Sequence, residues 1–579
     1  LEFSVSSGGM VSALLGVQNM RMVWVGWCEL EDATPEEKQL VRRHMLRRGC
    51  VPIFLEKSVA RGYYNGFCND VLWPLFHYVS RSPDEEGSEQ AAQQEQWRCY
   101  REANNKFADT VAAVARSEDV VWVHDYHLML LPSMLRERLP RLRIGWFLHT
   151  PWPSSEVFRM LPFRIEILRG LLGADLLGFH VYEYARHFLH ACTHLLGSEV
   201  SLRARHLAWD RPQGEGEESH GGAARQLVRV DAFPIGIDPD RFSLGIEAPS
   251  VVSRITELRR QFEGMQVLLG VDRVDYIKGI PQKLLAVETL LEAHPEYVGK
   301  VVLLQIAVPT RTEVPEYQKL RATAHRIVGR INGRFGSVGY VPIHYLDKSV
   351  AFEELCALYF ISAACVVTSL RDGMNLVSYE YVACQGESKG VLVLSEFAGA
   401  AQALGAGCVR VNPYNTEELA RGMHTALSME HEQRGELHAY AHQYVTKFTA
   451  QAWAQNFVSQ LQRTADAHTA SDRTTHALPL PTHELLGAYR NASRRLLMLC
   501  MGGTFLPGSE EKGGTSDGER DDVSLTHAQR DMLRRLLRDP ANTVLLVSGR
   551  SRERMDSLLH DVLHDEDAAA GADADADAE

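Results

Sequence analysis

Short apolar runs alternate with longer stretches of helical periodicity along most of the chain. Seven runs are apolar on both faces and rich in branched or aromatic residues: 119–123, 143–148, 228–233, 265–271, 301–307, 364–369 and 390–395. Such runs are typical of a parallel sheet covered by helices on both faces. The pattern therefore predicts a doubly wound α/β fold. Because the runs are too many for one sheet, we expect two domains that face a ligand cleft.

Polar low-complexity segments divide this pattern. The acidic stretches 80–96 and 212–224 are expected to be surface loops, and the chain ends in AAAGADADADAE, which cannot bury a core. We predict a first Rossmann-like domain over 1–235 and a second over 236–463, with the final helices of the second returning to the first. A linker over 464–482, a small domain over 483–566 and a disordered tail over 567–579 follow.

Composition narrows the classes of function. Of the 579 residues, 45% are hydrophobic and 23% are charged, as in folded globular proteins. The formal net charge of −13 argues against binding a nucleic acid over a broad surface. No segment approaches the roughly 18 consecutive apolar residues of a membrane helix, so no membrane contact is expected. The ten cysteines are scattered without a CxxC pair, which favours a reducing, cytoplasmic location.

Cations gather directly after one of the predicted strands. In a parallel sheet the carboxyl ends of the strands meet at one edge, where ligands bind. Arg273 and Lys278 follow the run 265–271, five residues apart across a turn that Gly279 closes. Two cations at this spacing can converge on a nucleotide diphosphate. Taken singly, such a pair is more often a solvated surface pair.

A second turn, Asp372 to Asn375, opens a helix pattern that carries Glu380. Backbone N–H groups at a helix N-terminus favour phosphate, and the two carboxylates suit paired sugar hydroxyls. Taken singly, an Asp-Gly pair is usually only a turn. The glycine-rich loop that ends at Gly9 precedes another helix pattern and would let the backbone approach a phosphate.

Three histidines on one helix face, His187, His190 and His194, suggest a metal site at first sight. No carboxylate stands near them at ligand spacing, and aromatic residues surround them, so we interpret them as packing residues. The sequence predicts no bound metal and no cofactor.

Seven motifs, in chain order, resemble those of trehalose-6-phosphate synthases from about residue 6 to about residue 460. They are SSGGMVSALLG, GYYNGFCNDVLWPLFHY, VWVHDYHLMLLP, GWFLHTPWPSSEVFRMLP, GVDRVDYIKGIPQKL, QIAVPTRTEVPEY and LRDGMNLVSYEYVACQ. The resemblance implies a GT-B glycosyltransferase that moves glucose from UDP-glucose to glucose 6-phosphate with retention at the anomeric carbon. It also implies same-face attack by the acceptor hydroxyl, with no protein nucleophile and no metal.

The resemblance assigns roles residue by residue. The donor-binding residues it implies are Gly9, His149, Arg273, Lys278, Asp372, Gly373, Met374, Asn375, Leu376, Val377 and Glu380. The acceptor-binding residues it implies are Tyr64, Trp73, Asp125 and Arg311, the last of these on the phosphate. The residues closest to the chemistry would be Asp125, His149, Arg273, Lys278 and Asp372. Base recognition relies largely on backbone contacts, so the residues leave UDP, GDP and ADP open as donor nucleotides.

Two departures from the family pattern qualify this interpretation. The family opens with a strand and an Asn-Arg turn whose Arg binds the acceptor phosphate, and this sequence starts after it. Segments 494–507 and 543–555 resemble the haloacid-dehalogenase-like trehalose-phosphate phosphatase domain, but Cys500 and Gly502 replace both aspartates of its first motif. We therefore expect a truncated, degenerate phosphatase fold without activity.

Other interpretations remain open at this point. The chain could be a catalytically silent subunit that binds sugar phosphates and regulates or scaffolds active subunits, or a synthase that glucosylates glycerol 3-phosphate. A homo-oligomer, or a complex with a trehalose-phosphate phosphatase, also fits the resemblance.

Overall fold

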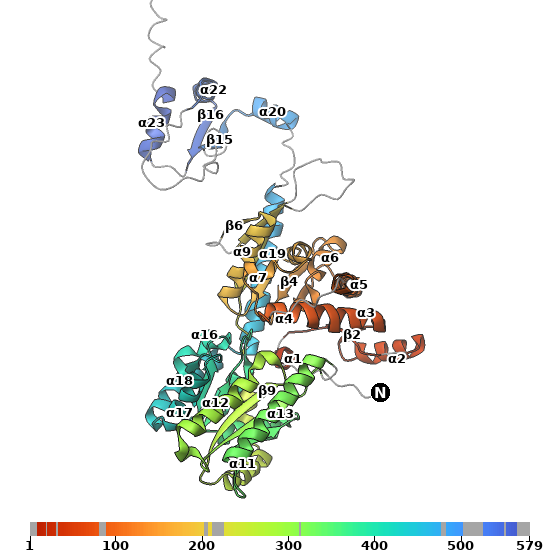
Figure 1. Cartoon of the computed structure of the whole chain (residues 1–579). Coiled ribbons are helices and arrows are strands. Elements are labelled where there is room, and N and C mark those ends of the chain that lie inside the picture. The colour runs from red at the N-terminus through yellow and green to blue at the C-terminus, as the bar shows by residue number, and fades with distance from the viewer. Residues whose placement is uncertain are drawn as a thin grey trace, which may run out of the picture. The chain divides into compact units, whose positions relative to one another are not determined.

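The structure is a computed structural model that describes residues 9–18, 20–30, 33–79, 88–201, 206–210, 225–311, 314–475, 482–501, 525–548 and 552–563. Packing divides the chain into two units, Leu1–Ala470 and Ser471–Glu579. Figure 1 colours the chain from red at the N-terminus to blue at the C-terminus. The first unit contains both large sheets and all of the sugar-phosphate site residues expected from the sequence.

The first large sheet has the strand order β3-β4-β5-β8-β7-β6. Strands β3, β4, β5 and β8 pair in parallel, whereas β7 pairs antiparallel with β8 and with β6. Their bounds are β3 Val120–His124, β4 Arg143–Phe147, β5 Leu176–Phe179, β6 Glu199–Ser201, β7 His206–Asp210 and β8 Arg225–Ala232. A separate parallel pair, β1 (Trp24–Trp27) and β2 (Cys50–Ile53), precedes this sheet along the chain. The parallel strands end at one common edge, which is where a ligand is expected.

Helices accompany the strands of this first part. They are α1 Gly9–Leu15, α2 Pro35–Leu46, α3 Lys57–Ala60, α4 Trp73–Phe76, α5 Ser88–Val114, α6 Leu131–Arg138, α7 Ser155–Phe158, α8 Arg164–Leu171 and α9 Tyr182–Leu196. A 12-residue π-helix, η1 (Arg61–Leu72), joins α3 to α4. A Cβ on Gly62 or Gly66 of η1 would lie within 2.7 Å of a side chain of α5, so both glycines permit close helix packing. Long π-helices are rare and frequently mark functional sites.

The second large sheet is entirely parallel, with the order β11-β10-β9-β12-β13-β14. Its strands are β9 Gln266–Arg273, β10 Val301–Val308, β11 Ile343–Leu346, β12 Ala364–Val367, β13 Val391–Ser395 and β14 Val409–Val411. Its helices are α10 Pro239–Glu247, α11 Pro249–Gln261, α12 Ile280–Ala293, α13 Pro315–Phe335, α14 Phe352–Ile361, α15 Leu376–Cys384, α16 Ala400–Leu404, α17 Thr416–Ser428 and α18 His431–Lys447. In Figure 1, α11, α12, α13, α17 and α18 lie around this second sheet.

Successive residues of this second sheet enter two different cores. Val267 and Leu269 of β9 pack in the core that includes α11, α14 and α15, whereas Leu268 between them packs in the core that includes α12, α13 and α17. Side chains of a strand alternate between the faces of its sheet, so both faces are covered by helices. The doubly wound α/β class expected from the apolar runs is confirmed.

Helix α19 (Ala450–Thr475) returns to the first sheet. Phe457 of α19 stacks on Trp122 of β3 with ring centroids 4.4 Å apart. A Cβ on Gly145 of β4 or on Gly178 of β5 would lie 2.7 Å from the Phe457 ring. These two glycines therefore let the helix lie directly on the sheet. The helix also runs into the segment 464–482 that was expected as a linker, so the bounds of the domains stay a prediction.

The second unit contains a small α/β element. Strands β15 (Arg495–Cys500) and β16 (Asn542–Val547) pair in parallel, and helices α20 (Thr482–Asn491), α22 (His527–Arg538) and α23 (Arg552–Leu563) accompany them. Cys500 ends β15, whereas Gly502 and the tail 567–579 lie outside the described residues. The phosphatase-like origin of this unit therefore stays a prediction.

One expectation about the loops is wrong in part. Residues 88–96 belong to α5, although the polar stretch 80–96 was expected to be a loop. Ala, Glu and Gln are strong helix formers, and the polarity of this segment reflects a solvent-facing helix surface. The rest of that stretch, 80–87, and all of the second expected loop, 212–224, lie outside the described residues.

Candidate active site

The turn after β9 is built around a capped one-turn helix. Asp275 accepts a hydrogen bond from the backbone N–H of Ile277 at 3.3 Å and so caps the 3₁₀-helix η3 (Tyr276–Lys278). Gly279 then adopts a left-handed conformation with φ of 65°. A Cβ at this position would lie 2.1 Å from the carbonyl oxygen of Thr368, so only glycine fits. The turn places Arg273 and Lys278 at the carboxyl end of β9.

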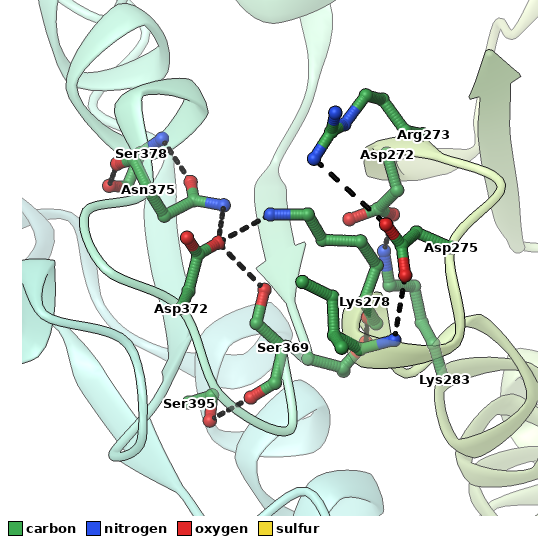
Figure 2. A network of polar contacts seen from close by, with 12 residues as sticks. Asp272, Arg273, Asp275, Lys278, Lys283, Ser369, Asp372, Asn375, Ser378 and Ser395 are labelled. Carbon is green, nitrogen blue, oxygen red and sulfur yellow. Dashed lines mark hydrogen bonds and ion pairs between the residues drawn. The ribbon is translucent and has the colours of Figure 1, made fainter. Parts of the chain in front are cut away.

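Lys278, which follows β9, forms an ion pair with Asp372, which follows the neighbouring strand β12. Its Nζ donates to Oδ2 of Asp372 at 2.6 Å, and Oδ2 also accepts from Ser369 and Asn375 at 3.3 Å each, as Figure 2 shows. Burial alone would raise the pKa of Asp372, but the charge of Lys278 and the hydrogen bonds from Lys278 and Asn375 lower it. Asp372 is therefore an ionised, fixed carboxylate that can accept from sugar hydroxyls.

Helix α15 points its N-terminus into the same region. Asn375 caps the helix by accepting from the backbone N–H of Ser378 at 3.0 Å. The first backbone N–H groups of any helix lack partners within the helix and attract anions. Gly9, the first residue of α1, lies against this end of α15, because a Cβ on Gly9 would be 2.8 Å from Cδ1 of Leu376. The structure thus brings Gly9 and the N-terminus of α15 together.

Glu380 lies one turn further along α15, and its pKa is raised. Tyr359 of α14 donates its hydroxyl to Oε2 of Glu380 at 2.8 Å. Burial disfavours the carboxylate and raises the pKa of Glu380 to about 7, although Tyr359 and Arg241 act in the opposite direction. Glu380 can therefore exchange a proton near neutral pH when a ligand binds.

Asp125 and His149 meet at the carboxyl ends of β3 and β4. Oδ1 of Asp125 accepts from the backbone N–H of His149 at 3.2 Å, and Oδ2 lies 3.6 Å from Nδ1 of His127. Asp125 has φ of 70° and ψ of 174°, a conformation that non-glycine residues rarely adopt. Strain of this kind persists only where the surroundings enforce it, commonly at functional sites. Burial would raise the pKa of Asp125, but its histidine partners lower it to about 2.

His149 is held as a neutral imidazole. Its Nε2 lies 3.1 Å from Nδ1 of His124, so the two rings share one hydrogen bond. Burial lowers the pKa of His149 well below its usual range, and neighbouring His124 and His180 lower it further. Neutral imidazole can donate and accept hydrogen bonds with sugar hydroxyls.

Aromatic side chains of the first domain meet cations of the second. Trp73, at the junction of η1 and α4, lies 4.4 Å from the guanidinium of Arg311 and 5.6 Å from that of Arg273, measured to the ring centroid. Arg311 itself has φ of 47° and donates a hydrogen bond to the hydroxyl of Tyr317. Tyr64 of η1 stacks on His127, beside Asp125. The π-helix therefore carries Tyr64 and leads directly to Trp73.

Two further contacts connect the parts that bear the two sheets. Tyr184 of α9 donates its hydroxyl to the carbonyl oxygen of Asp372 at 3.2 Å. A Cβ on Gly373 would lie 2.2 Å from the carbonyl oxygen of His149, so the turn and the His149 loop touch. The turn from Gly373 through Met374 to Val377 consequently faces the end of β4.

Sequence reasoning missed several side chains of this region. Asp275, His124 and the buried His77, whose ring is tilted by 41° to the ring of Trp73 with centroids 4.1 Å apart, were not among the expected residues. Asp275 and His124 stand inside two of the seven motifs, and this place in the motifs was the signal that could have marked them as site residues. His187, His190 and His194 lie elsewhere: His190 contacts Ser155 and His194 at 2.9 Å each. Within the described ranges, no group of three or more His, Cys, Asp or Glu residues could hold a metal ion.

Comparison with known proteins assigns the chain to a family. The family model described as glycosyltransferase family 20 matches residues 1–463. The chain belongs to this family. It is 47% identical over 557 residues to alpha,alpha-trehalose-phosphate synthase [UDP-forming] 1 of Arabidopsis thaliana, covering 96% of this chain and 57% of that protein. The chain thus spans little more than half the length of this relative. The resemblance expected from the seven motifs is confirmed.

Solved structures of family members match the same part of the chain. One is the E. coli protein bound with UDP-2-fluoro glucose, with a TM-score of 0.68 and 32% identity, covering 79% of this chain and 97% of that one. Another is a UDP-forming synthase of Burkholderia xenovorans in complex with glucose 6-phosphate, with a TM-score of 0.68, 31% identity, and 79% and 97% coverage. The fold is therefore that of the GT-B synthases.

Proposed function

We propose that this family 20 chain is a retaining glucosyltransferase that moves glucose from UDP-glucose to glucose 6-phosphate, giving trehalose 6-phosphate and UDP. One observation carries the proposal: Arg273 and Arg311 of the second domain contact Trp73 of the first domain, whose ring centroid lies 5.9 Å from that of Tyr126, the residue after Asp125. The names of the relatives and the ligands of the two solved structures support the same donor and acceptor.

The donor occupies the second domain in this proposal. Arg273, Lys278 and the N-terminus of α15 bind the diphosphate, and Glu380 binds the ribose hydroxyls. Lys278 is paired with Asp372 in the structure, so it supplies positive charge without being a free buried cation. When the bond to the leaving diphosphate breaks, negative charge develops on the phosphate oxygen. Fixed cations at that point stabilise the transition state more than the bound substrate.

The acceptor occupies the first domain and the edge of the second. Arg311 binds the phosphate of glucose 6-phosphate, and Trp73 and Tyr64 shape the sugar subsite. Nε1 of Trp73 is buried and donates no hydrogen bond to any described residue, so it can serve a ligand oxygen. Asp125 and His149 orient the hydroxyls of the two sugars. Attack occurs on the face from which the diphosphate leaves, and the leaving phosphate oxygen accepts the proton of the attacking hydroxyl.

Location and assembly are part of the proposal. Nine of the ten cysteines are free thiols, namely Cys28, Cys50, Cys68, Cys99, Cys192, Cys356, Cys365, Cys384 and Cys408. Free thiols suit a reducing compartment, which supports the cytoplasm. In the described part of the chain, no helix is long and apolar enough to cross a membrane. A homo-oligomer stays a prediction that light scattering of the purified chain can test. A complex with a trehalose-phosphate phosphatase stays one that light scattering of the chain mixed with such a phosphatase can test.

The experiment that tests the proposal compares acceptors. UDP release from UDP-glucose is measured with glucose 6-phosphate, with glycerol 3-phosphate and without acceptor. The proposal expects release only with glucose 6-phosphate. Release with glycerol 3-phosphate alone would indicate the related glucosylglycerol-phosphate synthase, and no release with either acceptor would indicate the silent regulatory subunit. Asp125→Asn serves as the matched control and is expected to lose the acceptor-dependent rate.

A further inference from the structure

Asp275 lies between the two arginines to which the proposed function gives different phosphates. Its side chain is fully buried, with 0% exposed, although it stands in the turn after β9. One oxygen, Oδ1, accepts from the backbone N–H of Ile277 and caps η3. The cap uses only Oδ1, so it does not explain why Oδ2 is buried.

The second oxygen, Oδ2, faces two guanidinium groups. It lies 3.8 Å from Nη1 of Arg311 and 4.0 Å from Nη2 of Arg273, and Figure 2 shows the contact with Arg273. Oδ2 is buried and accepts no hydrogen bond from any described residue. A buried charge is costly unless opposite charges compensate it. The two arginines are the compensating charges, and one carboxylate oxygen serves both.

The arginines need such a partner in return. Both guanidinium groups lie over Trp73, and both approach the same carboxylate oxygen, so two like charges are held within about 8 Å of each other. Like charges at this separation repel, and long arginine side chains otherwise sample many rotamers. An anion fixed between them reduces the repulsion and limits the rotamers of both.

We propose that Asp275 is a positioning residue that orients Arg273 for the donor diphosphate and Arg311 for the acceptor phosphate at the same time. The inference rests on the proposed function, which assigns these two phosphates to these two arginines. Asp275 contacts neither substrate and acts only through the guanidinium groups. Electrostatics alone predicts the opposite effect, because removing a negative charge beside two phosphate subsites should tighten phosphate binding.

The test uses Asp275→Asn, which removes the charge and keeps an N-cap oxygen for Ile277. Calorimetry on the whole chain measures UDP binding, and glucose 6-phosphate binding with UDP present. We expect Asp275→Asn to weaken each affinity about tenfold. In the Arg273→Ala background it should change UDP affinity less than about twofold, and in the Arg311→Ala background it should change glucose 6-phosphate affinity equally little.

Other results overturn the proposal. Unchanged or tighter binding by Asp275→Asn would show that the carboxylate is only an opposing charge. Losses that add to those of both arginine variants would show general structural damage. Asp272→Asn is the matched control, since Asp272 is a buried carboxylate three residues earlier, on β9, but pairs with Lys283 at 2.5 Å, and its effect on UDP affinity should add to that of Arg273→Ala. If the chain binds UDP but not glucose 6-phosphate, the proposed function fails, and the UDP measurements still decide the role of Asp275.

Discussion

The proton on Glu380 makes donor binding depend on pH in a calculable way. With a pKa of about 7, Glu380 is about 90% protonated at pH 6 and about 10% at pH 8. A carboxylate accepts hydrogen bonds from ribose hydroxyls more strongly than a carboxylic acid does. If only the ionised form binds the ribose, UDP-glucose affinity should be about tenfold weaker at pH 6 than at pH 8, a difference of about 1.4 kcal/mol.

Calorimetric titration with UDP-glucose, without acceptor, is the suitable assay because this ligand has no phosphate group that titrates between pH 6 and pH 8. At pH 7, binding should release about half a proton, which is measured by repeating the titration in buffers with different ionisation enthalpies. Glu380→Gln should remove the pH dependence and weaken binding at pH 8 by about 1.5 to 3 kcal/mol.

A control variant on a neighbouring helix separates this effect from general changes. Glu354 of α14 pairs with Arg254 on α11, so Glu354→Gln removes a carboxylate that has no expected contact with the donor. It should keep the tenfold pH dependence. A wild-type affinity that is constant from pH 6 to pH 8, or that tightens as the pH falls, would refute the assignment of Glu380 to the ribose.

Three further predictions follow from the site and the second unit. Lys278→Ala should weaken UDP-glucose binding by about 2 to 5 kcal/mol in calorimetry, because it removes a phosphate contact and leaves the buried Asp372 carboxylate without its cation; near-normal affinity would contradict this. Burial lowers the pKa of His77, His124 and His180 to about 4, so the unfolded chain takes up protons first as the pH falls from 6.5 to 4. Each histidine should then lower the free energy of unfolding by up to about 3 kcal/mol, and the raised pKa of Glu380 should offset the effect of about one histidine. Denaturant titrations at pH 7 and pH 4.5 that give equal free energies of unfolding would contradict the burial argument. The purified chain should release no phosphate from trehalose 6-phosphate with Mg²⁺, since Cys500 and Gly502 stand where two aspartates are needed, and measurable release would overturn the expectation of an inactive phosphatase region.

The sequence predicted those parts of the fold that depend on local pattern. Each of the seven apolar runs overlaps a strand, because strands buried on both faces are apolar throughout. Strand β5 was missed, since its four residues are few and their leucines continue the leucine-rich pattern of the preceding helix α8. The π-helix η1 was also missed, because no simple apolar periodicity distinguishes it from an α-helix.

The candidate site divides in the same way. The phosphate-binding turn after β9 and the cap of α15 are local features, and their residue types alone indicated cations and carboxylates. The acceptor residues were named only by the family resemblance. The contact of Trp73 with Arg273 and Arg311 joins segments about 200 residues or more apart, so it depends on how the two domains pack. Asp275 was missed because a local cap already accounts for an aspartate at this position. The role of its second oxygen depends on Arg311, which lies 36 residues further along the chain.

The most direct test of the central claim is the identity of the product. Proton NMR of a reaction that contains the chain, UDP-glucose and glucose 6-phosphate reports the configuration at both anomeric carbons. Retention predicts UDP and a non-reducing disaccharide phosphate in which both anomeric protons show the small coupling of an α linkage. A β-linked product, a reducing disaccharide, or glucose and UDP without any disaccharide would contradict the proposed glucosyl transfer.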